Sequence, residues 1–156
     1  MFWLTRVRSH SMAPTLADGS LVLTRRLGRA ARLRRGELVI VDSRELGEPL
    51  VKRIIGLPGE AVALKEGRVR IDGRALLEPY ASPSVFTDSY RVPPGHYFLL
   101  GDNRDASSDS RTWRNPYVPR ESIVGRIVRW PWERPLPVFG ARRECSKSLP
   151  DVTSSW

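Results

Sequence analysis

LVKRII, residues 50–55, is a short apolar segment with two adjacent cations, Lys52 and Arg53, at its centre. Pro49 precedes it and the turn-forming run GLPG, residues 56–59, follows it, which is typical of a β-strand. Adjacent side chains of a strand point to opposite faces, so Lys52 and Arg53 cannot share one environment. We therefore expect one of the two cations to face the interior of the fold.

Other short runs of the same kind are distributed along the chain and are separated by turn residues. They occupy residues 21–24, 37–41, 68–71, 96–100 and 123–130. The nearly continuous apolar run at 37–41 is typical of a strand buried on both faces, and Asp72-Gly73 is typical of a tight hairpin turn. No long segment shows a sustained helical period. These patterns predict an all-β fold, a small barrel or a folded sheet.

The length and composition of the chain predict one folded domain. Its 156 residues are 40% hydrophobic and 28% charged, which supports one compact core and excludes extensive disorder. We expect this domain at residues 1–133, with a small β excursion at about 65–95 that is irregular between the prolines of 79–94. Residues 134–156 are rich in Pro, Arg and Ser, and we expect them to form a weakly ordered tail.

The charge of the chain is strongly positive. There are 26 Lys and Arg against 17 Asp and Glu, a net charge of +9, which attracts nucleic acid or acidic phospholipid. Six arginines fall in one short stretch: Arg25, Arg26, Arg29, Arg32, Arg34 and Arg35. They form either a solvated loop or a patch that faces a membrane. A basic, non-catalytic β-barrel is the competing class, but no tryptophan is interleaved with these arginines and no nucleic-acid motif is present, so we expect no nucleic-acid partner.

The sequence supports neither a metal site nor a cofactor. Cys145 is the single cysteine, and the two histidines, His10 and His96, lie far apart and outside any metal-binding motif. No run reaches the roughly 18 apolar residues of a membrane span, so we expect the chain as written to be soluble or peripheral. The apolar start Met1-Phe2-Trp3-Leu4 has the character of an interfacial segment.

Three segments carry groups that could build an active site. In SHSMAPTL, residues 9–16, Ser11 is a candidate nucleophile, but the adjacent His10 is poorly placed to bond its side chain. An inward-facing Lys52 loses hydration, which lowers its pKa and makes it a candidate general base. The polar loop GDNRDASSDSR, residues 101–111, is better suited to a rigid scaffold than to a calcium site, because two arginines interrupt its oxygen donors. A Ser–Lys dyad uses these groups.

Together these segments resemble, in order and spacing, the motif boxes of bacterial type I signal peptidases. The matching residues are SHSMAPTL at 9–16, Lys52-Arg53 followed by GLPGE at 56–60, and the polar loop at 101–111. The resemblance runs from about residue 7 to residue 129. It implies an all-β serine endopeptidase that removes signal peptides from exported preproteins at a small-x-small site. It also implies a location at the plasma membrane, with the catalytic domain on its extracytoplasmic face and an anionic membrane surface as a partner.

The resemblance assigns roles to the matched residues. Ser11 would be the nucleophile and Lys52 the general base, while the backbone N–H of Ser11 and the hydroxyl of Ser9 would form the oxyanion hole. Ser107 would orient the lysine, and Asp109 would pair with Arg111 to hold the polar loop. The shallow pockets for the substrate would be lined by Val7, Met12 and Val51.

The sequence departs from the family pattern in two places. His10 stands where the family usually has glycine, which leaves an inactive homologue as an alternative. Members of the family carry an N-terminal membrane anchor, whereas about eight residues precede the first motif here. We expect either an anchor missing from the chain or a peripheral form held by the arginines and by Phe2 to Leu4. A specialised maturation protease of the same superfamily is a further alternative, but the complete polar loop favours the general enzyme.

Overall fold

A computed structural model describes residues 1–42 and 47–128, and nearly all of its regular structure is β-strand, as the sequence predicts. Two short 3-10 helices, η1 and η2, complete the regular elements of this part of the chain. The elements are β1 (Phe2–Arg6), β2 (Leu21–Arg26), β3 (Leu38–Val41), β4 (Leu50–Gly56), β5 (Ala61–Lys65), β6 (Arg68–Ile71), β7 (Arg74–Ala75), β8 (Asp88–Arg91), β9 (His96–Leu100), η1 (Arg104–Ala106), β10 (Val118–Pro119), η2 (Arg120–Ser122) and β11 (Ile123–Ile127).

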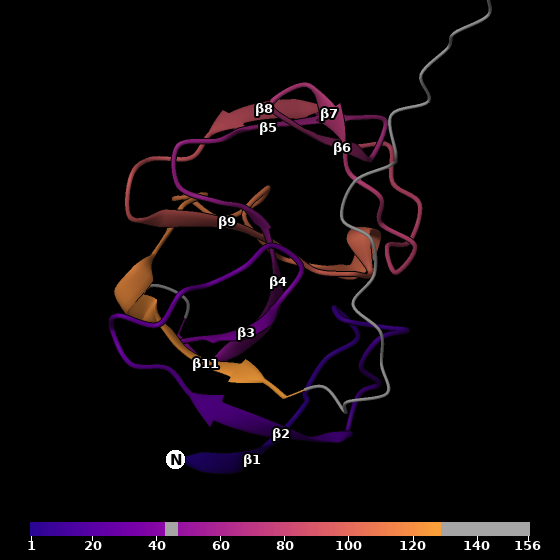
Figure 1. Ribbon diagram of the computed structural model, residues 1–156. Helices are drawn as coiled ribbons and strands as arrows, with labels where there is room; N and C mark the ends of the chain where they lie inside the picture. Colours follow the sequence, from indigo (N-terminus) through magenta and orange to yellow (C-terminus); the bar gives the residue numbers. More distant parts are fainter. Residues whose placement is uncertain (43–46, 129–156) are drawn as a thin grey trace, which may run out of the picture.

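The larger sheet has seven strands in the order β1-β2-β11-β3-β4-β9-β10, all paired antiparallel. It curves from β1 and β2 at the bottom of Figure 1 to β9 above them. β3 and β4 lie inside it, and all four residues of β3 are buried. Val39 and Val41 pack in one apolar cluster and Leu38 and Ile40 in another, which explains the continuous apolar run predicted there.

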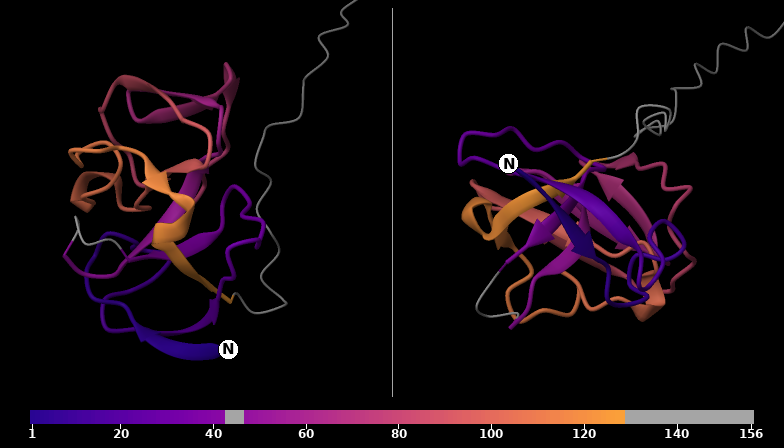
Figure 2. Two further views of the ribbon diagram at one scale, coloured as in Figure 1. Left: turned by 90° about the vertical axis from the view of Figure 1, so that its left-hand side faces the viewer. Right: turned by 90° about the horizontal axis from the view of Figure 1, so that it is seen from below.

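The smaller sheet has four strands in the order β7-β6-β5-β8 and lies over the end of β4. The two further views in Figure 2 show the same arrangement of the two sheets. Strands β6 and β7 are joined by Asp72-Gly73, whose φ angles of 48° and 79° are those of a type I′ turn. This confirms the hairpin predicted from that dipeptide.

Gly56 allows the two sheets to approach each other at the end of β4. A Cβ atom on this residue would lie 2.6 Å from Val62 of β5 and 2.9 Å from Phe98 of β9. The apolar cluster beneath the smaller sheet therefore includes residues of both sheets. The strand that carries Lys52 is thereby packed against both layers of the fold.

Several strands were not predicted from the sequence. β1, β5 and β10 were missed, and β8 lies in the stretch 79–94 that was expected to be irregular. Only Tyr90 of β8 is half-buried, so backbone pairing with β5, rather than apolar alternation, defines this strand. The last strand ends at Ile127, and residues 129–156, which include the predicted tail, lie outside the described residues.

Within residues 1–42 and 47–128, the structure has no helix with the length and apolar character needed to cross a membrane.

Candidate active site

Ser11 lies in the turn between β1 and β2 and is 6% exposed. Met12 is fully buried in the apolar cluster with Leu38 and Ile40, which fixes the turn to the large sheet. The amide of Leu16 donates to the Met12 carbonyl over 2.8 Å and closes the turn. The serine is thus a nearly buried hydroxyl on a short, anchored loop.

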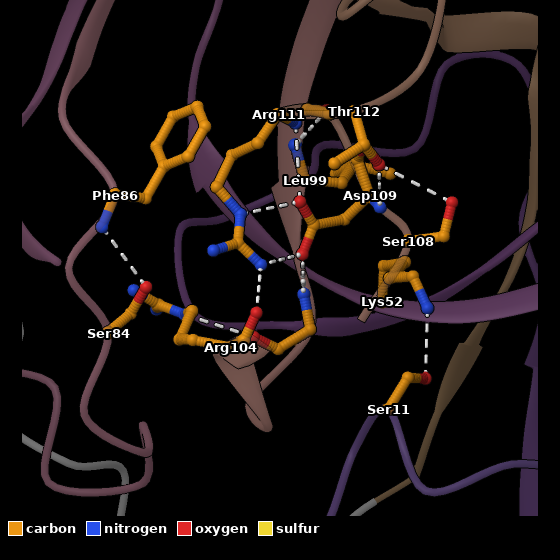
Figure 3. Close-up of polar contacts among 12 residues, drawn as sticks. Ser11, Lys52, Ser84, Phe86, Leu99, Arg104, Ser108, Asp109, Arg111 and Thr112 are labelled. Atoms are coloured by element: carbon orange, nitrogen blue, oxygen red, sulfur yellow. Dashed lines mark hydrogen bonds and ion pairs between the residues drawn. The ribbon is translucent and has the colours of Figure 1, made fainter. Parts of the chain in front are cut away.

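Lys52 of β4 reaches this hydroxyl directly. Its Nζ donates to Ser11 Oγ over 2.9 Å, and the lysine residue is 3% exposed (Figure 3). Burial lowers the pKa of Lys52 from 10.5 to about 8, although the carboxylates of Asp109 and Asp102 act in the opposite direction. A substantial fraction of this amine is therefore neutral near physiological pH.

Arg53, the next residue on β4, is also buried, at 2% exposure. The sequence predicted that one of the two cations would face the interior, but both do. Arg53 binds both carboxylate oxygens of Asp102, over 2.8 and 2.6 Å, and its guanidinium stacks 3.8 Å above the ring of Tyr80. A second buried cation is tolerated because its charge is paired and its donors are satisfied.

Ser9 lies beside the Ser11 hydroxyl and is exposed at the surface of the turn. Its Oγ donates to Ser11 Oγ over 3.0 Å and accepts the Ser11 backbone N–H over 3.3 Å. The two donors predicted for an oxyanion hole thus lie next to each other and next to the Ser11 hydroxyl oxygen. Ser9 has a φ of 145°, in a region that residues other than glycine rarely adopt.

The polar loop after β9 is held by a buried ion pair. Asp109 and Arg111 form two hydrogen bonds, of 2.8 and 2.9 Å, and Asp109 also accepts the backbone N–H of Gly101 over 3.0 Å. Figure 3 shows this pair beside Lys52 and Ser11. The charged groups of the loop thus bond to one another, which is the arrangement expected of a rigid scaffold.

Ser107 is buried in the same loop, but it does not bond to Lys52 in the structure. Its Oγ is the one buried polar side-chain atom of the described residues with no hydrogen-bond partner. It lies over Gly101, where an added Cβ atom would be 2.1 Å from this Oγ and 2.6 Å from the Ser11 carbonyl oxygen. The hydroxyl is therefore free to bond to a group that enters the site.

A groove of about 230 Å³ lies between the chain that leads into Ser11 and the start of β4. Val7, Met12 and Val51, the three residues expected to contact substrate, line it together with Ser9, Ser11 and Lys52. On the other side of β4, pairing with β9 begins only at Arg53, so residues 50–52 have no strand partner there among the residues that the structure describes. An extended peptide in this groove would pass both Ser11 and Lys52.

His10 takes no part in these contacts through its side chain. The side chain is exposed, whereas the backbone carbonyl accepts the Asn103 amide over 3.1 Å and the Ala13 N–H over 3.1 Å. His96 is remote, on β9. Within the described part of the chain, no group of three His, Cys, Asp or Glu side chains could hold a metal ion.

Further contacts around the site were not predicted from the sequence. Thr15 donates to Asp102, and the Asn103 N–H donates to the Ser11 carbonyl over 3.0 Å, so the polar loop holds the turn that carries Ser11. Elsewhere in the polar loop, the buried Arg104 forms an ion pair with Glu78. Neighbouring carboxylates and arginines in the polar loop were the available signal, but their partners are far apart in sequence.

These groups are those of covalent hydrolysis by a serine. A hydroxyl in hydrogen-bond contact with a largely desolvated amine can be deprotonated and can attack a carbonyl. Donors next to the same oxygen can stabilise the charge that develops. The groove has room beside these groups for a segment of extended chain.

Comparisons with known proteins agree with this chemistry. The family described as "Signal peptidase, peptidase S26" matches residues 1–132. Signal peptidase I of Leptolyngbya laminosa is 38% identical over 141 residues, which cover 82% of this chain and 68% of that protein. Signal peptidase I T of Bacillus subtilis (strain 168) is 37% identical over 132 residues, which cover 76% and 68% of the two chains.

A solved structure is also similar. The crystal structure of a signal peptidase I from Enterococcus faecalis V583 superposes with a TM-score of 0.53 and 30% sequence identity. The match covers 64% of this chain and 98% of the solved one.

Proposed function

The chain belongs to the signal peptidase family, peptidase S26, whose members are serine endopeptidases that remove signal peptides, and we propose that Ser11 and Lys52 carry out this cleavage here. The observation that carries the proposal is the 2.9 Å hydrogen bond between Lys52 Nζ and Ser11 Oγ inside a peptide-sized groove. The lysine is the base because burial lowers its pKa to about 8 and because His10 lies outside the groove lining.

The reaction proceeds through a covalent intermediate. Neutral Lys52 accepts the Ser11 proton as Oγ attacks the scissile carbonyl carbon, and the resulting ammonium then protonates the leaving amine. A water molecule, deprotonated by the same lysine, hydrolyses the acyl-enzyme and regenerates Ser11. Two donors stabilise the tetrahedral oxyanion, the Ser11 N–H and the Ser9 hydroxyl, after they release their contact with each other.

Three residues of the polar loop support Lys52. Ser107 accepts a hydrogen bond from the lysine in the substrate complex, and its buried, unpartnered hydroxyl supports this role. The Asp109–Arg111 pair keeps the loop in place. Of the two carboxylates that raise the pKa of Lys52, Asp109 and Asp102, Asp109 has the larger effect.

The substrate is an exported preprotein that binds as an extended strand. The free edge of residues 50–52 offers backbone hydrogen bonds, which recognise a strand without reading its sequence. Val7, Met12 and Val51 leave little room in the groove, so small side chains are selected at the first and third positions before the cut.

The enzyme acts at the plasma membrane on its extracytoplasmic face, where the outer face of the β1–β2 hairpin meets anionic lipid. Phe2, Leu4, Leu21 and Leu23 are 58%, 66%, 58% and 41% exposed and project from two paired strands. The exposed arginines of β1, β2 and the following loop flank this apolar face, and their charge matches acidic headgroups. Four neighbouring apolar side chains in water indicate an interaction surface.

Cleavage of a preprotein with an Ala-x-Ala site, in lipid or detergent, tests the reaction. We expect the parent chain to cut after the second alanine and the Ser11→Ala and Lys52→Met variants to lose at least about a thousandfold in rate. Lys65→Met, at an exposed position of β5, is the matched control and is expected to retain full activity. Normal cleavage by Lys52→Met would refute the dyad, and an inactive parent would indicate a non-catalytic homologue.

Sedimentation with lipid vesicles tests the membrane surface. Binding is expected to phosphatidylglycerol-containing vesicles and to be weaker for pure phosphatidylcholine. The double variant Leu4→Asp, Leu21→Asp should stay in the supernatant, whereas Val85→Asp, at a residue 90% exposed on another part of the molecule, should still sediment. Equal binding of both variants would contradict this surface.

A further inference from the structure

The pairing of β1 with β2 continues beyond the two strands toward the active site. The register of the two strands places Thr5 opposite Val22 and Arg6 opposite Leu21. The Val7 N–H continues the pairing with a 2.8 Å bond to the Ser20 carbonyl, and the Gly19 N–H then donates to the Val7 carbonyl over 2.8 Å, so the register shifts by one residue there and the chain before Gly19 runs alongside the chain after Val7. Asp18 is thus held beside Ser9 by the fold itself.

At Ser9 a side chain replaces the backbone acceptor. The Ser9 N–H donates to Asp18 Oδ1 over 2.9 Å. Ser9 has a φ of 145°, a conformation that is unfavourable for a residue with a Cβ atom and that persists only where surrounding contacts enforce it. Within the described part of the chain, this is the hydrogen bond that holds the Ser9 backbone.

The conformation of Ser9 decides where its hydroxyl points. Its Oγ lies 3.0 Å from Ser11 Oγ and 3.3 Å from the Ser11 amide nitrogen, next to the place where the substrate oxyanion forms. The other contacts of the turn hold different atoms, since Asn103 binds the carbonyls of His10 and Ser11. A rotation of the Ser9 backbone would therefore move the hydroxyl while the nucleophile and the base stayed in place.

We propose that Asp18 is a positioning residue for the cleavage reaction, which holds Ser9 in its strained conformation and thereby aims the Ser9 hydroxyl at the oxyanion. This inference rests on the proposed role of Ser9 in the oxyanion hole. Asp18 is exposed and, within residues 1–42 and 47–128, bonds to neither Ser11 nor Lys52, so it acts through Ser9 alone. Its effect is on the transition state, because the oxyanion exists only there.

A double-mutant cycle tests the proposal. Ser9→Ala, which keeps the Cβ atom, is expected to lower kcat about a hundredfold, as is usual for the loss of one oxyanion donor. Asp18→Ala is expected to lower kcat about tenfold with KM unchanged. In the Ser9→Ala background, Asp18→Ala should have no further effect, because the hydroxyl it aims is absent.

Two further variants separate positioning from folding. Asp18→Asn keeps an Oδ1 acceptor and should restore kcat to within about threefold of the parent. Asp88→Ala removes an exposed carboxylate that accepts the Ser89 N–H over 2.7 Å in the smaller sheet, and it should leave kcat unchanged. Thermal unfolding of each variant shows whether the fold is retained.

Each outcome decides the question. A tenfold loss for Asp18→Ala that persists in the Ser9→Ala background, or a rise in KM alone, would overturn the positioning role while leaving the Ser11 and Lys52 assignment intact. Full activity of Asp18→Ala, together with a reduced kcat of Ser9→Ala, would also overturn the positioning role. Full activity of Ser9→Ala would overturn both this inference and the proposed oxyanion hole.

Discussion

Replacement of Lys52 by methionine should abolish cleavage and at the same time stabilise the fold at neutral pH. The lysine is 3% exposed, and its burial lowers the pKa from 10.5 in the unfolded chain to about 8 in the folded protein. At pH 7 the amine is protonated in both states, so folding takes a charged group out of water. Methionine has a similar length and no charge.

The size of the effect follows from the two pKa values. Each pKa unit corresponds to about 1.4 kcal/mol, so the parent loses about 3 kcal/mol of stability at pH 7 that the variant does not lose. Between pH 8 and pH 10.5 the unfolded chain binds the proton that the folded protein has released, so the parent gains stability as the pH rises. Above pH 10.5 the amine is neutral in both states and the difference vanishes.

Urea unfolding of the parent and of Lys52→Met at pH 7 and pH 10.5 measures this difference. We expect the variant to be more stable by about 3 kcal/mol at the lower pH and nearly equal at the higher pH. Lys65→Met, on the exposed side of β5, should change stability by less than about 0.5 kcal/mol at either pH. A Lys52→Met variant less stable than the parent at pH 7, or a gap that does not close with pH, would refute the desolvated base.

Three more outcomes are expected. In the parent, kcat/KM should rise with pH to a plateau above about pH 8. In Asp109→Asn this rise should move to lower pH, because the Asp109 carboxylate raises the pKa of Lys52 in the parent and is absent from the variant. An unshifted profile would contradict this. Asp102→Ala should lower the free energy of unfolding in urea by about 3–5 kcal/mol, since Arg53 is left buried without its partner, and a loss under 1 kcal/mol would contradict a desolvated pair. Gly101→Ala should lower kcat about a hundredfold, because the new Cβ atom would lie 2.1 Å from the Ser107 hydroxyl oxygen and displace it. Unchanged kinetics in the same assay would show that the loop shifts to accommodate the methyl group.

The all-β fold could be predicted from the sequence because its central strands are apolar on both faces. Residues 38–41 and 50–56 are defined by their own composition, whereas β8 is defined by its partner and has no comparable signal. Lys52 was identifiable for the same reason, since a cation inside an apolar strand is unusual.

The contacts that arrange the site could not be predicted in the same way. The pairs Arg53 with Asp102 and Arg104 with Glu78 join residues 49 and 26 positions apart. Which carboxylate meets which arginine depends on the curvature of the large sheet and on the path of the polar loop. A list of charged residues contains every member of these pairs but not their pairing.

Lys52 and Ser11 lie in parts of the fold that differ in their local stability against unfolding. Lys52 belongs to β4, which pairs with β3 and, from Arg53 onward, also with β9, and which is packed between apolar clusters. Ser11 belongs to a turn held by a few hydrogen bonds and by the buried Met12. On heating, such a turn opens by local unfolding well before the central strands separate. The enzyme should therefore lose activity reversibly at a temperature below its melting point, with amide exchange fast around Ser11 while the amides of β4 from Arg53 onward remain protected.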